Sequence, residues 1–123
     1  MKERLCYCDT GLFYEDCCGI YHKNKKAPTA LALMRSRYSA YASHQADYLL
    51  ETTHISERRY YTKVAILDWA TSNQWLRLEI LNFTENTVEF KAYYLDEYER
   101  EQIHHEFSTF KKENEQWFFV NGR

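Results

Sequence analysis

Residues 6–19 read CYCDTGLFYEDCCG and contain all four cysteines of the 123-residue chain. A segment this short cannot bury enough apolar surface to fold by hydrophobic packing alone. Four thiolates around one tetrahedral metal ion can hold it instead, because structural zinc contributes about 10–16 kcal/mol of apparent binding free energy at pH 7. We expect a small knuckle with one structural Zn²⁺, bound by the thiolates of Cys6, Cys8, Cys17 and Cys18.

Two disulfides are the alternative arrangement for these cysteines. They need an oxidising compartment, and the adjacent Cys17 and Cys18 would each have to find a different partner. The sequence shows no secretory leader, no run of eighteen apolar residues and no lipidation motif. We therefore expect a cytoplasmic protein without a membrane segment, in which clustered cysteines bind metal rather than oxidise.

The composition of the chain argues against nucleic acid as a partner. Its 16 Lys and Arg residues are offset by 18 Asp and Glu residues, which gives a formal net charge of −2. Nucleic-acid binders neutralise phosphates with a basic surface, and the basic concentration at residues 23–26 is interpreted here as a solvated linker. Aromatic residues make up 17% of the chain, which is enough for a well-packed core.

The cysteine spacing, together with Thr10, Gly11, Tyr14 and Gly19, resembles the SEC-C motif. That motif is the zinc-binding tail of the SecA translocation ATPase and occurs in many other bacterial proteins. The resemblance covers fourteen positions and implies the same four cysteines as zinc ligands. His22 is a fifth candidate, but four thiolates already complete a structural site, so we expect a surface histidine at this position.

The knuckle departs from the SEC-C pattern at positions that set its charge. The family usually has proline where Tyr7 stands, glycine at Asp9, and lysines where this chain has Leu12, Phe13, Glu15 and Asp16. The knuckle is therefore less basic than its relatives, which removes support for a role with acidic lipids or nucleic acid. Docking onto the main domain or onto a partner is the expected role of its apolar residues, Leu12, Phe13 and Tyr14.

Helical periodicity begins after the linker, at Pro28 and Thr29. Thr29 is the expected N-cap of a helix over residues 30–43, whose apolar side chains recur at helical spacing. A second helix is expected over about residues 45–53. A third helix, with a less regular pattern, is expected over roughly residues 57–71.

From about residue 74 the pattern changes from helical to alternating, which indicates half-buried strands. We expect a turn at Glu85-Asn86 and four strands, over residues 76–80, 88–94, 102–110 and 116–120. Three helices followed by four sequential strands predict an α+β fold, in which a curved four-stranded antiparallel sheet wraps over the long first helix.

Most of the chain beyond the knuckle resembles the YchJ-like bacterial family, in blocks at residues 27–30, 34–41, 47–49, 52–54, 105–108 and 117–122. That family joins a SEC-C motif to a cone-shaped domain similar to the nuclear transport factor 2-like, or cystatin-like, superfamily. The resemblance implies a zinc knuckle with its linker over residues 1–26 and the α+β domain over residues 27–123. The family is uncharacterised, so the resemblance implies a fold and a metal but not a reaction.

The resemblance also implies a pocket between the curved sheet and the long helix. On the third strand, alternation places His105 on one face and His104 with Glu106 on the other, and either face could line the pocket. Tyr38 on the first helix is a further lining candidate. The sequence contains no nucleophile elbow, phosphate-binding loop or HExxH motif, and no catalytic residue is assigned.

Two arginines on the first expected helix are further candidates for binding an anionic ligand. Arg35 and Arg37 lie about 200° apart around the helix axis, so they cannot form a joint anion clamp. We expect one of them to be buried against a carboxylate such as Glu51 or Glu106, and the other to lie in water.

The sequence leaves two functions open. The favoured hypothesis is a non-enzymatic zinc-binding protein whose knuckle contacts another protein. The alternative is a small-molecule binding protein, or an isomerase- or dehydratase-like enzyme, that uses the cone pocket.

Overall fold

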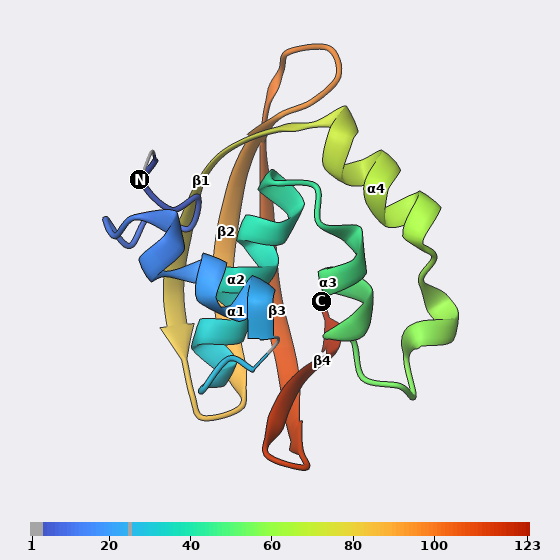
Figure 1. The fold of residues 1–123 in the computed structure, drawn as a ribbon. Helices are drawn as coiled ribbons and strands as arrows, with labels where there is room; N and C mark the ends of the chain where they lie inside the picture. The colour runs from blue at the N-terminus through green and yellow to red at the C-terminus, as the bar shows by residue number, and fades with distance from the viewer. Residues whose placement is uncertain (1–3, 25) are drawn as a thin grey trace.

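The computed structural model describes residues 4–24 and 26–123, and in it helices precede a single sheet (Figure 1). The helical elements are η1 (Tyr14–Asp16), α1 (Cys18–Asn24), α2 (Ala30–Ala42), α3 (Ala46–Glu51), η2 (Arg58–Tyr60) and α4 (Lys63–Ser72). The strands are β1 (Gln74–Phe83), β2 (Thr87–Leu95), β3 (Glu101–Glu113) and β4 (Gln116–Gly122).

The sheet is an antiparallel meander in the order β1-β2-β3-β4, so each strand pairs with its neighbour in sequence. Register shifts interrupt the β1–β2 ladder between Trp75 and Arg77 and again between Ile80 and Asn82. Such irregularities bend a strand and increase its twist, and the sheet curves around α2 (Figure 1). The predicted α+β fold, with helices on a curved four-stranded antiparallel sheet, is confirmed.

Helix α2 is the centre of the hydrophobic core. As predicted, Thr29 caps it, because the Thr29 hydroxyl accepts a hydrogen bond from the Ala32 amide at 3.0 Å. Leu33 is 1% exposed and Val88 on β2 is fully buried. Eight of the thirteen residues of α2 are buried, so this helix is covered on nearly all sides and contacts the sheet, α1 and α3.

Two elements differ from the expectations. The third helix is divided into η2 and α4, because the Thr62 side chain accepts a hydrogen bond from the Ala65 amide and starts a new helix at that point. The expected linker is partly helical, since α1 continues through residues 22–24. Among the described helices, none combines the length and apolar character needed to cross a membrane.

Candidate functional site

The N-terminal segment folds back on itself as a miniature hairpin. The Cys6 amide donates to the Leu12 carbonyl at 2.8 Å, and the Tyr14 amide donates to the Arg4 carbonyl at 3.0 Å. Gly11 lies in the left-handed region with φ of 86°, a conformation that glycine adopts without strain. The return of the chain, followed by the single turn η1, places the second pair of cysteines beside the first.

The four cysteine sulfurs form one cluster. All four Sγ atoms lie within 4.8 Å of one another, and the Sγ atoms of Cys8 and Cys17 are 3.6 Å apart. Tetrahedral Zn–S bonds of about 2.3 Å place sulfurs roughly 3.8 Å apart, so the cluster fits a tetrahedral metal ion. All four cysteines are free thiols, and His22 is not a member of the cluster.

The thiols perturb one another because they are close and buried. Hydrogen bonds from the Cys18 and Cys8 thiols lower the pKa of Cys6. The Cys6 sulfur in turn raises the pKa of Cys18, with burial adding to the effect. Four thiolates this close repel one another, so they need a cation among them. This donor set can hold a metal ion.

The sulfur cluster is docked on α2 and β1 rather than held apart from them. Arg35 Nη1 donates to the Cys8 carbonyl at 2.7 Å, so Arg35 does not lie free in water as expected. The Leu78 amide on β1 donates to Asp9 Oδ2 at 2.9 Å. Asp9 has φ of 65°, a left-handed conformation that glycine adopts without strain. The bond from the Leu78 amide gives the aspartate side chain a docking role here.

His22 belongs to the same docking interface, so the expectation of a surface histidine was wrong. Its Nε2 lies 2.8 Å from the Ser36 carbonyl, which can only accept, so Nε2 carries the proton. Its Nδ1 then accepts, and it lies 2.5 Å from the Tyr14 hydroxyl and 3.0 Å from Gln45 Nε2. Burial lowers the pKa of His22, which is consistent with a neutral ring that joins α1 to α2.

A cavity of about 160 Å³ lies between α2, α4 and the concave face of the sheet. Eight of its fourteen lining side chains are aromatic: Tyr38, Tyr41, Tyr61, Trp69, Trp75, Phe90, Phe110 and Phe119. The polar lining residues are Arg37, His104, Glu106 and Ser108. The structure therefore places Tyr38, His104 and Glu106 at the cavity.

His105 does not line the cavity, so of the two alternatives that the sequence left open, the face with His104 and Glu106 is the one at the cavity. His105 Nε2 is 2.7 Å from Glu89 Oε2, and the His105 side chain is 51% exposed. Alternation along β3 was predicted correctly, but both faces carry apolar residues. Only the tertiary structure, in which His104, Glu106 and Ser108 line the cavity, shows which face of β3 is enclosed.

The polar residues of β3 form a connected row along the cavity wall. His104 Nε2 is 2.8 Å from Glu106 Oε1, and the Ser108 hydroxyl donates to Glu106 Oε2. Burial on its own would raise the pKa of Glu106, but the bonds from His104 and Ser108 bring it below its ordinary value. The bond to Glu106 raises the pKa of His104. Glu106 is therefore paired with His104 and hydrogen-bonded by Ser108 within the row.

Arg37 is a cavity residue whose hydrogen-bond partners differ from those expected from the sequence. It is 8% exposed, and its Nη1 donates to the Leu49 carbonyl at 2.8 Å and to Thr52 Oγ1 at 2.7 Å. Its guanidinium lies over the Phe119 ring, 4.5 Å from the centroid. Glu106 attracts Arg37 through space, but the hydrogen bonds of Arg37 go to a carbonyl and to hydroxyls rather than to the expected carboxylate.

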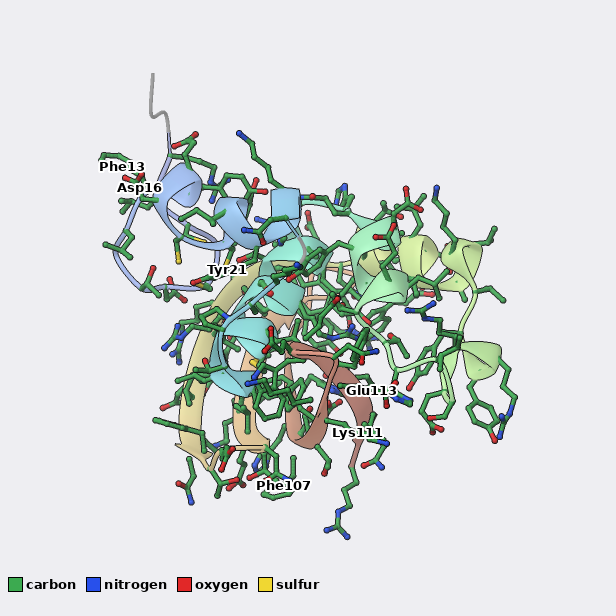
Figure 2. All side chains as sticks on the ribbon, turned by 60° about the horizontal axis from the view of Figure 1, so that its bottom comes forward. Phe13, Asp16, Tyr21, Phe107, Lys111 and Glu113 are labelled. Atoms are coloured by element: carbon green, nitrogen blue, oxygen red, sulfur yellow. The ribbon has the colours of Figure 1, made fainter. Side chains whose placement is uncertain are left out.

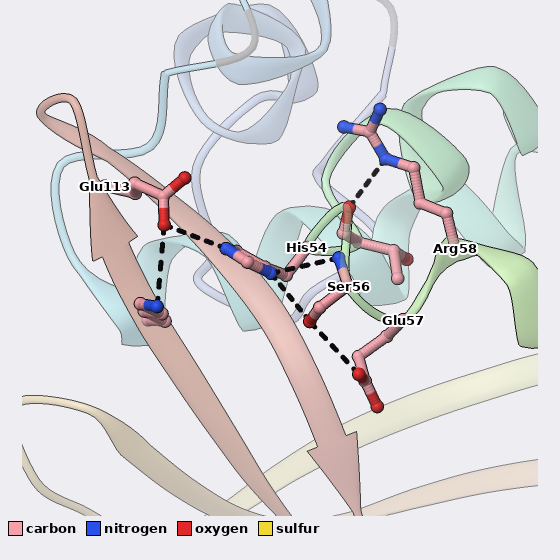
Figure 3. A network of polar contacts seen from close by, with 7 residues as sticks. His54, Ser56, Glu57, Arg58 and Glu113 are labelled. Carbon is pink, nitrogen blue, oxygen red and sulfur yellow. Dashed lines mark hydrogen bonds and ion pairs between the residues drawn. The ribbon is translucent and has the colours of Figure 1, made fainter.

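A second polar network lies at the other end of β3, outside the cavity (Figure 3). His54 Nε2 is 3.0 Å from Glu113 Oε2, and His54 Nδ1 is 2.8 Å from Ser56 Oγ. Although these are the residue types of an acid–histidine–serine relay, the Ser56 amide also donates to Nδ1, as in a tight turn, and the hydroxyl donates to Glu57. The network fastens the chain after α3 to the β3–β4 hairpin.

Comparison with known proteins accounts for both parts of the chain. Residues 29–122 match the family model described as YchJ, middle NTF2-like domain. The chain belongs to the YchJ family. A UPF0225 protein of Haemophilus influenzae strain PittEE is 41% identical over 122 residues, which cover 94% of this chain and 76% of the relative. A UPF0225 protein of Geobacter sulfurreducens is 39% identical over 126 residues, with 96% and 78% covered.

Two solved structures resemble this YchJ family member over nearly its whole length. A SEC-C motif-containing protein from Rhodopseudomonas palustris is 36% identical, with a TM-score of 0.86 and 96% of each chain covered. A SEC-C motif-containing protein from Psychrobacter arcticus is 32% identical, with a TM-score of 0.84, and 98% of this chain and 82% of that chain are covered. The YchJ-like resemblance is confirmed, and these neighbours carry the SEC-C description.

Proposed function

We propose that the four cysteines bind one structural Zn²⁺ and that the resulting knuckle is a contact site for another protein. The observation that carries the proposal is the sulfur cluster, whose four Sγ atoms lie within 4.8 Å of one another. An all-thiolate tetrahedral set is the donor chemistry of structural zinc and of iron–sulfur sites. With four thiolates closing the coordination sphere, the metal has no open position for substrate, so its role is structural.

The contact surface is formed by four exposed apolar side chains, which we call the knuckle surface. Leu5 is 56% exposed and Leu12 is 53% exposed, and Phe13 and Ile20 are each 43% exposed. Figure 2 shows Phe13 at the outer corner of the N-terminal segment, directed away from the sheet. Tyr14, in contrast, points inward to His22 and Gln45. Exposed apolar side chains gathered on so small a segment favour a protein partner with a complementary apolar segment.

The charge of the knuckle favours a protein over nucleic acid or an acidic membrane. Four thiolates around Zn²⁺ carry a formal charge of about −2, and Glu15 and Asp16 lie beside Phe13 in sequence. Such a surface repels phosphate groups rather than neutralising them.

The metal assignment is tested by native mass spectrometry and elemental analysis of protein purified without added metal. The wild type is expected to carry one zinc, and Cys8→Ser none. His22→Gln is the matched control, because His22 lies beside the cluster without being a ligand, and it is expected to retain one zinc. Iron in place of zinc, or stoichiometric zinc in Cys8→Ser, would contradict the proposal.

The knuckle surface is tested with a variant that combines Leu12→Asp and Phe13→Asp. It is expected to keep its zinc and its fold but to lose a partner that co-purifies stoichiometrically with the wild type. Val64→Asp is the control, since Val64 is 79% exposed and belongs to α4, a helix that lies on the other side of the molecule from the N-terminal segment in Figure 1. Equal recovery of the partner by all three proteins would contradict the assigned surface.

The aromatic cavity supports a second function, the binding of a small molecule. Ligand sites are typically concave, mostly apolar and furnished with a few convergent polar groups, and this cavity has that composition. A thermal-shift screen of small metabolites against the full chain tests it, because a ligand of the folded state raises the unfolding temperature.

A further inference from the structure

We propose that the cavity binds a small organic carboxylate, held through the free edge of the Arg37 guanidinium, with its apolar body against the aromatic walls. The inference gives the second candidate function a ligand class and rests on that function. It is independent of the zinc site.

The first step concerns the hydrogen bonds of Arg37. Among the described residues, all of its hydrogen bonds are made by Nη1, to the Leu49 carbonyl and to the hydroxyls of Thr52 and Thr53. Nε and Nη2 donate to no described residue. No buried side-chain nitrogen or oxygen of the described residues lacks a partner, so these two nitrogens must keep some accessible surface. Arg37 lines the cavity, and we place that surface there.

The second step concerns charge. Guanidinium is charged at all physiological pH values, and burying a charge without a partner is costly. Arg37 is 8% exposed and forms no ion pair with a described residue. The Phe119 ring below the guanidinium compensates only in part, because an aromatic face carries no full counter-charge. A carboxylate across Nε and Nη2 would add a directly bonded counter-charge through two hydrogen bonds.

The third step concerns Glu106, the acidic side chain of the cavity. Glu106 is the negatively charged lining residue, and both of its oxygens already accept hydrogen bonds, from His104 and Ser108. Glu106 attracts Arg37 through space but accepts no hydrogen bond from it, so the Nε and Nη2 edge of Arg37 remains available to an anion. Tyr41 and Tyr61 also line the cavity.

Size and lining define the rest of the ligand. The cavity of about 160 Å³ is close to a ~150 Å³ engineered cavity that accepts benzene. Its aromatic walls suit a flat or branched apolar group. The ligand class is therefore a monocarboxylate with a body about the size of one aromatic ring, for which benzoate is a suitable probe.

The test titrates three probes that each carry one benzene ring into the zinc-loaded full chain and follows backbone amides and the Arg37 Nε–H resonance by NMR. Benzoate is expected to shift the Arg37 resonance and the lining residues in a saturable manner. Benzamide, which lacks the charge, is expected to bind at least about tenfold more weakly. Benzylammonium is expected not to bind, because it would face Arg37.

Two variants locate the effect. Arg37→Lys keeps the positive charge but removes the pair of N–H donors that can bind a carboxylate in a bidentate manner. It should weaken benzoate binding by about tenfold or more. Arg77→Lys is the control, because Arg77 lies over Tyr93 on the other side of the sheet from the cavity, and it should leave binding unchanged. If Arg37→Lys does not fold, the response of the wild-type Arg37 resonance to benzoate still tests whether Arg37 binds the carboxylate.

The outcomes separate the two levels of the proposal. Benzamide or benzylammonium binding as tightly as benzoate would overturn the carboxylate class while leaving a ligand-binding cavity. An unperturbed Arg37 resonance at saturating benzoate would overturn the role of Arg37. Failure of all three probes to bind would overturn this inference together with the small-molecule function from which it starts, and would leave the zinc proposal unaffected.

Discussion

At the scale of single residues, Gly19 shows how little space the knuckle leaves. A Cβ at this position would lie 2.6 Å from the Tyr14 carbonyl oxygen and 3.0 Å from Tyr14 Cε2. The backbone oxygen cannot move aside as a flexible side chain could. Because Gly19 directly follows Cys17 and Cys18, a shift of this backbone also displaces two sulfurs.

Gly19→Ala is therefore expected to destabilise the protein by about 1–3 kcal/mol, as overpacking does elsewhere, and to weaken zinc retention. Thermal unfolding and chelator competition measure the two effects. Ile20→Ala at the neighbouring exposed position is the control and should change the unfolding temperature little. Equal behaviour of the two variants would show that η1 and α1 have more freedom than the contact distances indicate.

The paired residues His104 and Glu106 give a second prediction at this scale, a pH dependence of stability. The pKa of His104 is raised by Glu106, so the folded state binds the proton more tightly than the unfolded chain. The stabilisation is fully present below the unfolded pKa of about 6.5 and is lost as the pH rises through the raised folded value. The His104 side chain is 47% exposed, so solvent limits the effect to about 1 kcal/mol or less.

Urea unfolding of the wild type and of His104→Gln at about pH 5.5 and about pH 9 measures this contribution, with pH values chosen on either side of the ordinary histidine pKa. The wild type should exceed the variant at the lower pH, and the difference should shrink at the higher pH. NMR titration should place the pKa of His104 above the ordinary value and that of His22 below it. A difference in stability that grows with pH would contradict the assigned ion pair.

At the scale of elements, α2 and α4 contrast as two capped helices with unequal packing. Thr29 caps α2 and Thr62 caps α4 through the same type of bond, to an amide three residues later. Helix α2 has eight buried residues, whereas only Ile66 and Ala70 are buried in α4. The loss of an equivalent bond should therefore have different consequences in the two helices.

Thr29→Ala is expected to lower the free energy of unfolding by about 1 kcal/mol, the usual value for an N-cap, because α2 unfolds only with the whole core. Thr62→Ala should instead cause local opening of α4, with a smaller change in global stability. Urea unfolding measures the first effect and amide hydrogen exchange across α4 the second. A larger global loss in Thr62→Ala would contradict this ranking.

At the scale of the whole molecule, the knuckle and the α+β domain share one core. The four cysteine side chains belong to the same buried cluster as Leu33, Met34 and Tyr38 of α2. Polar contacts across the boundary include the bond from Arg35 to the Cys8 carbonyl and the bond from Leu78 to Asp9. Loss of the metal should therefore affect more than the segment that binds it.

Removal of the metal by a chelator under reducing conditions is expected to lower the unfolding temperature of the full chain and to release residues 4–24. The strands should persist, because their ladders and most of the α2 contacts do not involve the knuckle. Thermal unfolding and the dispersion of β-sheet NMR resonances report the two outcomes, and readdition of Zn²⁺ is the control. An unchanged unfolding temperature would show that the metal does not support the core.

Local features of the sequence were sufficient to predict the order of the elements, the cap at Thr29, the turn at Glu85-Asn86 and the set of four cysteines. Each depends on residues a few positions apart, where spacing and side-chain chemistry act directly. The predicted boundaries were less accurate where a side chain such as Thr62 started a new helix within one apolar pattern.

Only the tertiary structure decided which face of β3 encloses the cavity, that Arg37 bonds to carbonyl and hydroxyl groups rather than to a carboxylate, and that His22 joins the knuckle to α2. Alternation fixes that two faces exist but not which one is covered, because β3 carries apolar residues on both. The partners of Arg37 and His22 lie at least twelve residues away in sequence or on another element. Contacts between residues so far apart in sequence arise from the packing of whole elements, and a local sequence pattern does not predict them.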